Sequence, residues 1–135
     1  MTATITYLGN LRTEATHLLS GTTVLTDAPP DNQGLGAAFS PTDSTATSLG
    51  TCMLTTMGIS ARNHGINMDG AHAEVTKVMA ANPRRISKII VKITMPAGNY
   101  SELDQKKLEA AAHGCPVALS LHPDLEQDVQ FIWPS

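Results

Sequence analysis

The chain has 135 residues and a mass of 14.3 kDa, the usual size of one domain with its own hydrophobic core. Nine basic and twelve acidic side chains leave a formal net charge of −3, which argues against nucleic acid or an anionic membrane surface as a partner. Hydrophobic residues make up 41% of the sequence and aromatic residues only 4%, so we expect a core of aliphatic side chains and methionine within a single domain, residues 1–135.

The first 26 residues predict three short strands, because threonine and apolar residues alternate there between turn-forming pairs. The expected strands are 2–8, 13–17 and 22–26. A connection rich in proline and glycine follows, from Asp27 to Phe39. The N-terminus lacks the basic start and apolar run of a signal peptide, so we expect a cytoplasmic protein whose thiols are reduced.

A long helix is predicted over residues 41–64. Ser40 is suited to the N-cap, Pro41 to the first helical position, and Asp43 to the acidic position of a capping box. Gly65 can end the helix. Because no charged residue appears between Asp43 and Arg62, we expect this helix to be buried on most sides.

The second half predicts an antiparallel pair of strands, two helices and a last strand, which makes the chain an α+β protein with the order βββ-α-ββ-α-(α)-β. Alternation in 86–95 places four apolar side chains on one face: Ile89, Val91, Ile93 and Met95. A second helix should carry an apolar stripe made of Leu103, Leu108, Ala111 and Ala112. The expected elements are strands 71–79, 86–95 and 129–133 and helices 101–114 and 115–121.

The two cysteines, Cys52 and Cys115, are the first candidates for chemistry. A reactive thiol must ionise, and a nearby cation or helix N-terminus favours ionisation. Cys115 lies near an expected helix N-cap, so this argument alone favours Cys115. Cys52 lies too far into its helix for that effect and needs a cation such as Arg12, because Arg62 is some 15 Å further along the helix at 1.5 Å per residue. The alternative is that both cysteines are small, buried and inert side chains.

Other candidate sites are weaker. His113, Cys115 and His122 suggest a metal-dependent enzyme, but their spacing matches no established metal motif, and we predict neither a metal nor a cofactor. Gly34-Leu35-Gly36 lacks the third glycine of a dinucleotide-binding loop. Asp43 has an ordinary structural explanation as a capping residue.

Two segments together resemble the OsmC/Ohr family. Residues 39–53, Phe-Ser-Pro-Thr-Asp-Ser-Thr-Ala-Thr-Ser-Leu-Gly-Thr-Cys-Met, are similar to its central-helix motif. Residues 111–122, Ala-Ala-His-Gly-Cys-Pro-Val-Ala-Leu-Ser-Leu-His, are similar to its second-cysteine motif. The resemblance extends over essentially the whole chain. It implies antiparallel sheets packed on a long central helix, and an intertwined homodimer with active sites at the subunit interface.

The resemblance also implies a function, the reduction of organic hydroperoxides in the oxidative stress response. By position, Cys52 corresponds to the peroxidatic cysteine and Cys115 to the resolving cysteine. The family's catalytic arginine comes from the N-terminal strand region, where Arg12 is the only arginine, and Asp43 is the nearest acid, one position after the family's acidic residue. The implied reductant is a dithiol, such as a lipoylated protein. Thr42 stands where the hydroperoxide reductases usually carry Glu. That departure favours an alternative, a small-molecule-binding protein on the same fold with weak or no peroxidase activity.

Overall fold

The computed structural model describes residues 1–135, the whole chain. Its internal contacts group the residues into two compact units, 1–45 and 46–135. None of the helices is both long enough and apolar enough to cross a membrane.

The first unit is a three-stranded antiparallel sheet in the order β1-β2-β3, formed by β1 (Ala3–Gly9), β2 (Arg12–His17) and β3 (Thr23–Asp27). The three strands predicted from the sequence are confirmed, with boundaries that differ by one residue. Asn10 and Leu11 turn the chain between β1 and β2 with φ values of 54° and 63°. The connection after β3 contains a short 3-10 helix, η1 (Pro30–Asn32), and reaches Ser40.

One face of this sheet is apolar and exposed within the chain. The register aligns Ile5 with Ala15 and Ala15 with Val24, so these three side chains lie side by side across the strands. Tyr7 belongs to the same face. Ile5 is 70% exposed, Tyr7 64% and Val24 50%. A three-stranded sheet is stabilised by a covered hydrophobic face, and the other residues of the first unit do not cover this one.

The long helix α1 (Pro41–Asn63) begins at the predicted capping box. The Asp43 N–H donates to the Ser40 hydroxyl at 3.0 Å, and the Ser40 N–H donates to the Asp43 carboxylate at 3.0 Å. Along the helix, one face is buried and the opposite face is exposed, so the prediction of burial on most sides is wrong for the single chain. The buried face consists of Ala46, Leu49, Gly50, Met53, Met57 and Ala61. The exposed face carries uncharged polar residues and no charge before Arg62. The lack of charge in the sequence therefore predicted more burial than the structure shows.

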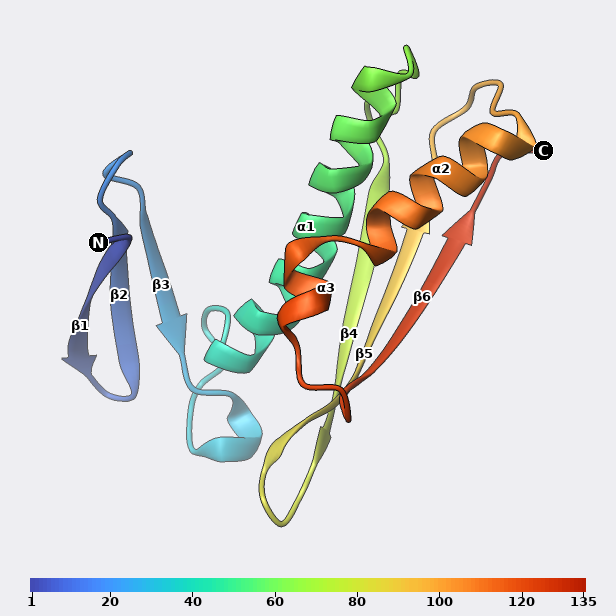
Figure 1. Ribbon diagram of the computed structural model, residues 1–135. Helices are drawn as coiled ribbons and strands as arrows, with labels where there is room; N and C mark the ends of the chain where they lie inside the picture. The colour runs from blue at the N-terminus through green and yellow to red at the C-terminus, as the bar shows by residue number, and fades with distance from the viewer. The chain divides into compact units, whose positions relative to one another are not determined.

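The second unit contains a three-stranded sheet in the order β4-β5-β6, formed by β4 (His72–Ala80), β5 (Arg85–Thr94) and β6 (Glu126–Ile132). The predicted β4–β5 pair is antiparallel, whereas β6 runs parallel to β5. Parallel neighbours need a crossover connection, and α2 (Glu102–His113) and α3 (Pro116–Ser120) supply it. Figure 1 shows α1 and α2 across one face of this sheet, with α3 beside α1.

The core of the second unit lies between that face of the sheet and the helices. The four predicted side chains of β5 and the segment after it, Ile89, Val91, Ile93 and Met95, are all buried. In α2, Leu108 and Ala112 are buried as predicted, but Leu103 is 60% exposed. Leu103 occupies the first turn of α2, which lies at the edge of the core rather than over it. β6 begins three residues earlier than predicted, because its polar start pairs with β5, where Lys88 bonds Glu126 at 3.1 Å.

Candidate functional site: a pair of cysteine thiols

The fold brings Cys52 and Cys115 together. Cys52 lies in the middle of α1, Cys115 is the N-cap of α3, and their side chains are hydrogen-bonded to each other. Both are free thiols. Cys115 is fully buried in the core, whereas Cys52 is half-buried. The pair therefore consists of one thiol that a solute can reach and one that solvent cannot.

Several groups around Cys52 stabilise its thiolate. Burial by itself raises the pKa of the Cys52 thiol, but the N–H of Val117, the thiol of Cys115 and the hydroxyl of Thr56 all hydrogen-bond the sulfur. Together these bonds outweigh the cost of burial and lower the pKa of Cys52 below its ordinary value. Thr56 lies one turn further along α1, and the single proton of its hydroxyl is shared between the sulfur and the Cys52 carbonyl oxygen, to which it donates at 2.8 Å.

Cys115 is affected in the opposite direction. Burial raises the pKa of the Cys115 thiol, and the neighbouring Cys52 sulfur raises it further. The Ala118 N–H in the first turn of α3 donates to the Cys115 sulfur at 3.3 Å, but this bond does not compensate for burial. The argument from the helix N-terminus, which favoured Cys115 as the more reactive thiol, is therefore wrong. The N-terminus of α3 does favour the Cys115 thiolate, but the cost of removing a fully buried sulfur from water is larger.

Arg12 lies on β2 in the first unit, where it faces Asp27 across the β2–β3 pair. The guanidinium is 3.7 Å from an Asp27 carboxylate oxygen, and the same oxygen accepts the Ala37 N–H at 2.9 Å. Asp27 is only 1% exposed, and its other carboxylate oxygen has no hydrogen-bond partner. A buried anion thus holds Arg12 at the start of β2, while 43% of the arginine side chain stays exposed.

Asp43 contributes to the capping box at the start of α1, as its sequence position predicted. Thr42, which stands where the family usually has Glu, is half-buried, and its hydroxyl lies 3.2 Å from that of Ser40. The three histidine and cysteine residues considered for a metal do not form a cluster, and no group of three or more His, Cys, Asp or Glu side chains is placed to hold one. His113 packs its ring against Phe131, with 5.8 Å between ring centroids.

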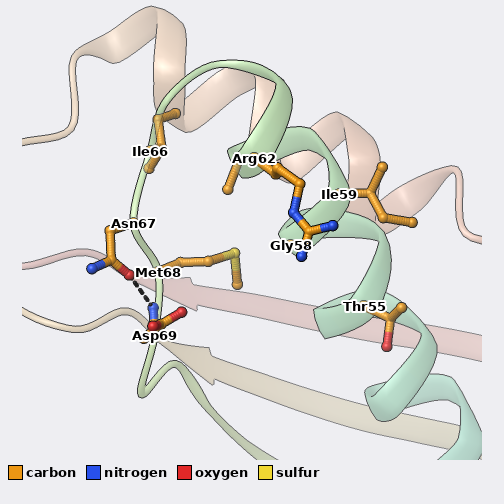
Figure 2. A pocket seen from close by; sticks show the side chains of 9 residues that line it. Thr55, Gly58, Ile59, Arg62, Ile66, Asn67, Met68 and Asp69 are labelled. Atoms are coloured by element: carbon orange, nitrogen blue, oxygen red, sulfur yellow. Dashed lines mark hydrogen bonds between the residues drawn. The ribbon is translucent and has the colours of Figure 1, made fainter.

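A hollow of about 470 Å³ opens at the C-terminal end of α1. It is formed by the last turns of the helix and the loop 66–69, and its walls include Ile59, Ile66 and Met68 (Figure 2). The Arg62 side chain extends back along the helix toward Gly58 (Figure 2). The backbone position of Arg62, roughly 15 Å beyond Cys52, overstates the separation of its charge, because long helical side chains point toward the N-terminus of their helix.

The arrangement of the two sulfurs suits reversible thiol oxidation. An accessible thiol with a lowered pKa is the better nucleophile, because the thiolate is the reactive form. A second thiol in contact with it can capture an oxidised sulfur as a disulfide before further oxidation occurs. Both steps use only side chains of the second unit.

Comparisons with known proteins agree with this description. The profile of the family described as OsmC-like protein matches residues 33–129. A crystal structure from Psychrobacter arcticus, of a protein with a presumed role in osmotic-stress induction and detoxification response, is 52% identical. The match covers 97% of this chain and 95% of that one, with a TM-score of 0.93. A search of curated proteins gave no match.

More distant structures share the fold. The organic hydroperoxide resistance protein OsmC of Legionella pneumophila is 16% identical with a TM-score of 0.73, over 100% of this chain and 98% of that one. The organic hydroperoxide resistance protein OhrB of Bacillus subtilis is also 16% identical, with a TM-score of 0.69 over 99% and 98% of the two chains. The family match covers both cysteines and most of the chain, and the 52% identical structure covers nearly all of it. This chain belongs to the OsmC family.

Proposed function

We propose that this protein is a cysteine-based peroxidase that reduces organic hydroperoxides to alcohols. The observation that carries the proposal is the asymmetry of the cysteine pair. Cys52 is reachable and has a lowered pKa, and Cys115 is buried beside it with a raised pKa. The fold shared with two organic hydroperoxide resistance proteins supports the same activity.

In the first step, the Cys52 thiolate attacks the peroxide oxygen that bears hydrogen, and the O–O bond breaks. The departing alkoxide takes a proton to become the alcohol, and Cys52 becomes a sulfenic acid. In the second step, the Cys115 sulfur attacks the Cys52 sulfur, and a disulfide forms as water leaves. A dithiol then reduces this disulfide by exchange and is itself oxidised, which restores both thiols. We propose a lipoylated protein as the dithiol.

Arg12 and Asp43 complete the proposed site. A guanidinium near the Cys52 thiolate stabilises its charge, and a carboxylate near the guanidinium orients it. Each side chain is held by a neighbour: the Arg12 guanidinium lies beside the Asp27 carboxylate, and the Asp43 carboxylate accepts a hydrogen bond in the capping box. Their proposed role requires the two units to meet in the working protein, which we take to be a single domain and cytoplasmic.

The working protein is proposed to be a homodimer. The exposed apolar face of the first sheet, with Ile5, Tyr7 and Val24, supports this assembly. A second copy of the chain would cover that face and supply the partner surface that the three-stranded sheet needs.

Thiol titration tests the proposed function. Free thiols are counted before and after one equivalent of cumene hydroperoxide in the wild type, Cys52→Ser and Cys115→Ser. We expect the wild type to lose both thiols rapidly, Cys115→Ser to stop at an oxidised Cys52, and Cys52→Ser to react no faster than free cysteine. Rapid oxidation of Cys115 in Cys52→Ser would reverse the two roles.

The second candidate is a small-molecule-binding protein with weak peroxidase activity, which Thr42 in place of Glu favours. The same titration separates the two candidates. If neither thiol of the wild type reacts faster than free cysteine, the peroxidase proposal is wrong and a search for a bound ligand replaces it.

A further inference from the structure

The short helix α3 supplies a backbone donor to each of the two cysteine sulfurs. The Val117 N–H bonds the Cys52 sulfur, and the Ala118 N–H donates to the Cys115 sulfur at 3.3 Å. The helix contains only five residues, Pro116–Ser120. Helices shorter than about 12 residues are unstable by themselves in water. Contacts with other elements must therefore hold α3 in the position that these two bonds require.

Gln127 on β6 makes one of these contacts. Its side-chain Nε2 donates to the Ala118 carbonyl oxygen at 2.9 Å. The last carbonyl groups of a helix have no partner within the helix, and Ala118 is buried, so water does not easily supply one. Gln127 therefore satisfies a carbonyl that α3 leaves without a helical partner, and it ties the helix to the sheet.

The place of Gln127 in the sheet is unusual for a polar residue. Gln127, Val129 and Phe131 alternate along β6, so their side chains lie on one face of the strand. Val129 and Phe131 pack against the buried core, and Gln127 is paired in register with the buried Ile89 of β5. This is the face of the sheet that the helices cover. The hydrogen bond to α3 explains why a glutamine amide lies there.

The two ends of α3 are held by different elements. At its start, the Cys115 N–H donates to the Ala112 carbonyl oxygen of α2 at 3.2 Å. At its other end, Gln127 holds the Ala118 carbonyl, and a loop continues from α3 to the start of β6 (Figure 1). Because α3 is little longer than one helical turn, a movement at Ala118 also displaces the neighbouring Val117 N–H.

We propose that Gln127 is a positioning residue for the pair of cysteine thiols. By bonding the Ala118 carbonyl, it fixes α3 in the position from which the Val117 N–H reaches the Cys52 sulfur. The same contact keeps the Cys115 sulfur beside Cys52, where a disulfide can form. This inference rests on the proposed function, in which Cys52 attacks the peroxide and Cys115 resolves the sulfenic acid.

The charges around the thiols allow this role to be tested cleanly. The three groups that bond the Cys52 sulfur are uncharged, and the one that titrates is the Cys115 thiol, whose raised pKa keeps it protonated where Cys52 ionises. The acidic neighbours of position 127 in the chain, Glu126 and Asp128, lie on the other face of β6 and both pair with Lys88. A neutral substitution at position 127 therefore changes hydrogen bonding around Cys52 without changing the charge near it.

The test follows alkylation of Cys52 by iodoacetamide as a function of pH, because only the thiolate reacts and no peroxidase activity is needed. Gln127→Met removes the donor, keeps the length of the side chain and suits the apolar face of β6. At pH 7 we expect the variant to react about threefold more slowly than the wild type, since half a pKa unit changes the thiolate fraction about that much. At pH values above the pKa of Cys52 in both proteins, the two rates should be equal. Peptide mass spectrometry assigns the alkylated cysteine.

Two further variants serve as controls. Gln130→Met makes the same change on the exposed face of β6 and should leave the dependence of the rate on pH unchanged. Gln127→Asn keeps an amide that is one carbon too short to reach Ala118, so it should change the dependence as Gln127→Met does, and it decides the matter if the methionine variant does not fold. An unchanged dependence at position 127, even with a lower free energy of unfolding, would leave Gln127 a purely structural role and overturn the inference. An equal change in Gln130→Met would overturn it too.

The resolving step provides a second readout. In excess cumene hydroperoxide, a second peroxide molecule can oxidise the Cys52 sulfenic acid to sulfinic acid, and is itself reduced to the alcohol, before Cys115 attacks. We expect Gln127→Met to accumulate more sulfinic acid than the wild type, because Cys115 is the N-cap of the displaced helix. Equal amounts would contradict the role of Gln127 in placing Cys115. If the wild type does not reduce cumene hydroperoxide, the proposed function is wrong, and the alkylation rates still decide whether Gln127 positions the donor to Cys52.

Discussion

Cys52 reacts, in this proposal, because hydrogen bonds from three neighbours outweigh the cost of its burial. No cation within the second unit takes part in lowering its pKa. The donors are a backbone N–H of α3, the partner thiol and a hydroxyl one turn along the same helix. A thiolate held this way depends on the docking of α3 against α1, so the same contact that brings Cys115 into position also activates Cys52.

Thr56→Val tests this account of the thiolate. Removing the hydroxyl should raise the pKa of Cys52, so the curve of reaction rate against pH moves to higher pH. At pH 7 we expect the variant to react with cumene hydroperoxide about threefold more slowly than the wild type. At pH values above the pKa of Cys52 in both proteins, where the thiol of each is ionised, the two rates should be equal. The control is Thr51→Val, whose hydroxyl donates to the Ser48 carbonyl at 3.1 Å and does not contact Cys52. If the reaction rate depends on pH in the same way in the wild type and in Thr56→Val, the prediction is wrong.

Among the secondary-structure elements, α1 and α2 both begin with a capping box. Each starts with a serine whose hydroxyl accepts the N–H of an aspartate three residues on, while the aspartate accepts the serine N–H in return. The capping role is therefore common to Asp43 and Asp104, whereas the proposed catalytic role belongs to Asp43 alone. This pairing allows the two roles to be separated experimentally.

Asp43→Asn and Asp104→Asn make the same change in the two capping boxes. Because the side-chain oxygen of asparagine can still accept the serine N–H, each should lower the free energy of unfolding by well under about 1 kcal/mol in urea titrations. If Asp43 also orients the cation at Cys52, only Asp43→Asn should slow peroxide reduction, by about tenfold. Similar rates of peroxide reduction in the two variants would show that Asp43 acts only as a capping residue.

The contact between α1 and its sheet depends on Gly50. A Cβ at this position would lie 2.7 Å from a methyl group of Val75 on β4, closer than two carbon atoms can pack. The helix that carries Cys52 therefore lies so close to the sheet at Gly50 that no side chain fits there. Gly58, two turns further along, has no neighbour within 4 Å of such a Cβ.

We therefore expect opposite effects from alanine at the two positions. Gly50→Ala should destabilise the protein by about 1 to 3 kcal/mol through overpacking, with partial recovery in Gly50→Ala combined with Val75→Ala. Gly58→Ala should stabilise it by about 0.5 to 1 kcal/mol through helix propensity. Denaturant unfolding of the three variants measures both effects, and a neutral Gly50→Ala would show that the helix can shift away from the sheet.

For the whole molecule, the central question is what covers the first sheet. Three side chains of its apolar face, those of Ile5, Tyr7 and Val24, are 50 to 70% exposed. Exposed apolar area of this extent marks an interaction surface. The homodimer proposed above gives these residues a function and would let each chain stabilise the strands of the other.

Light scattering after size exclusion tests the assembly. We expect a mass of twice 14.3 kDa for the wild type. Ile5→Glu places a charge at the centre of the apolar face and should shift the protein toward monomer, whereas Glu14→Gln, on the opposite face, should leave the dimer intact. A monomeric wild type at micromolar concentration would contradict the proposal.

The sequence alone determined the elements and their order. Capping boxes, turn residues and apolar alternation are local signals, and they placed the strands, the long helix and the buried face of β5 within a few residues. The two cysteine motifs also indicated the family before any fold was known. Leu103 and the exposed face of α1 were misjudged because burial depends on what packs against an element, which periodicity does not report.

The tertiary structure decided the chemistry of the cysteines. Sequence position suggested Cys115 as the more reactive thiol because it lies at a helix N-terminus, but docking of α3 on α1 buries that sulfur and raises its pKa. The same docking supplies the Val117 N–H to Cys52. A pKa depends on desolvation and on donors that arrive from distant parts of the chain, so only the packed structure shows in which direction the pKa of each thiol is shifted.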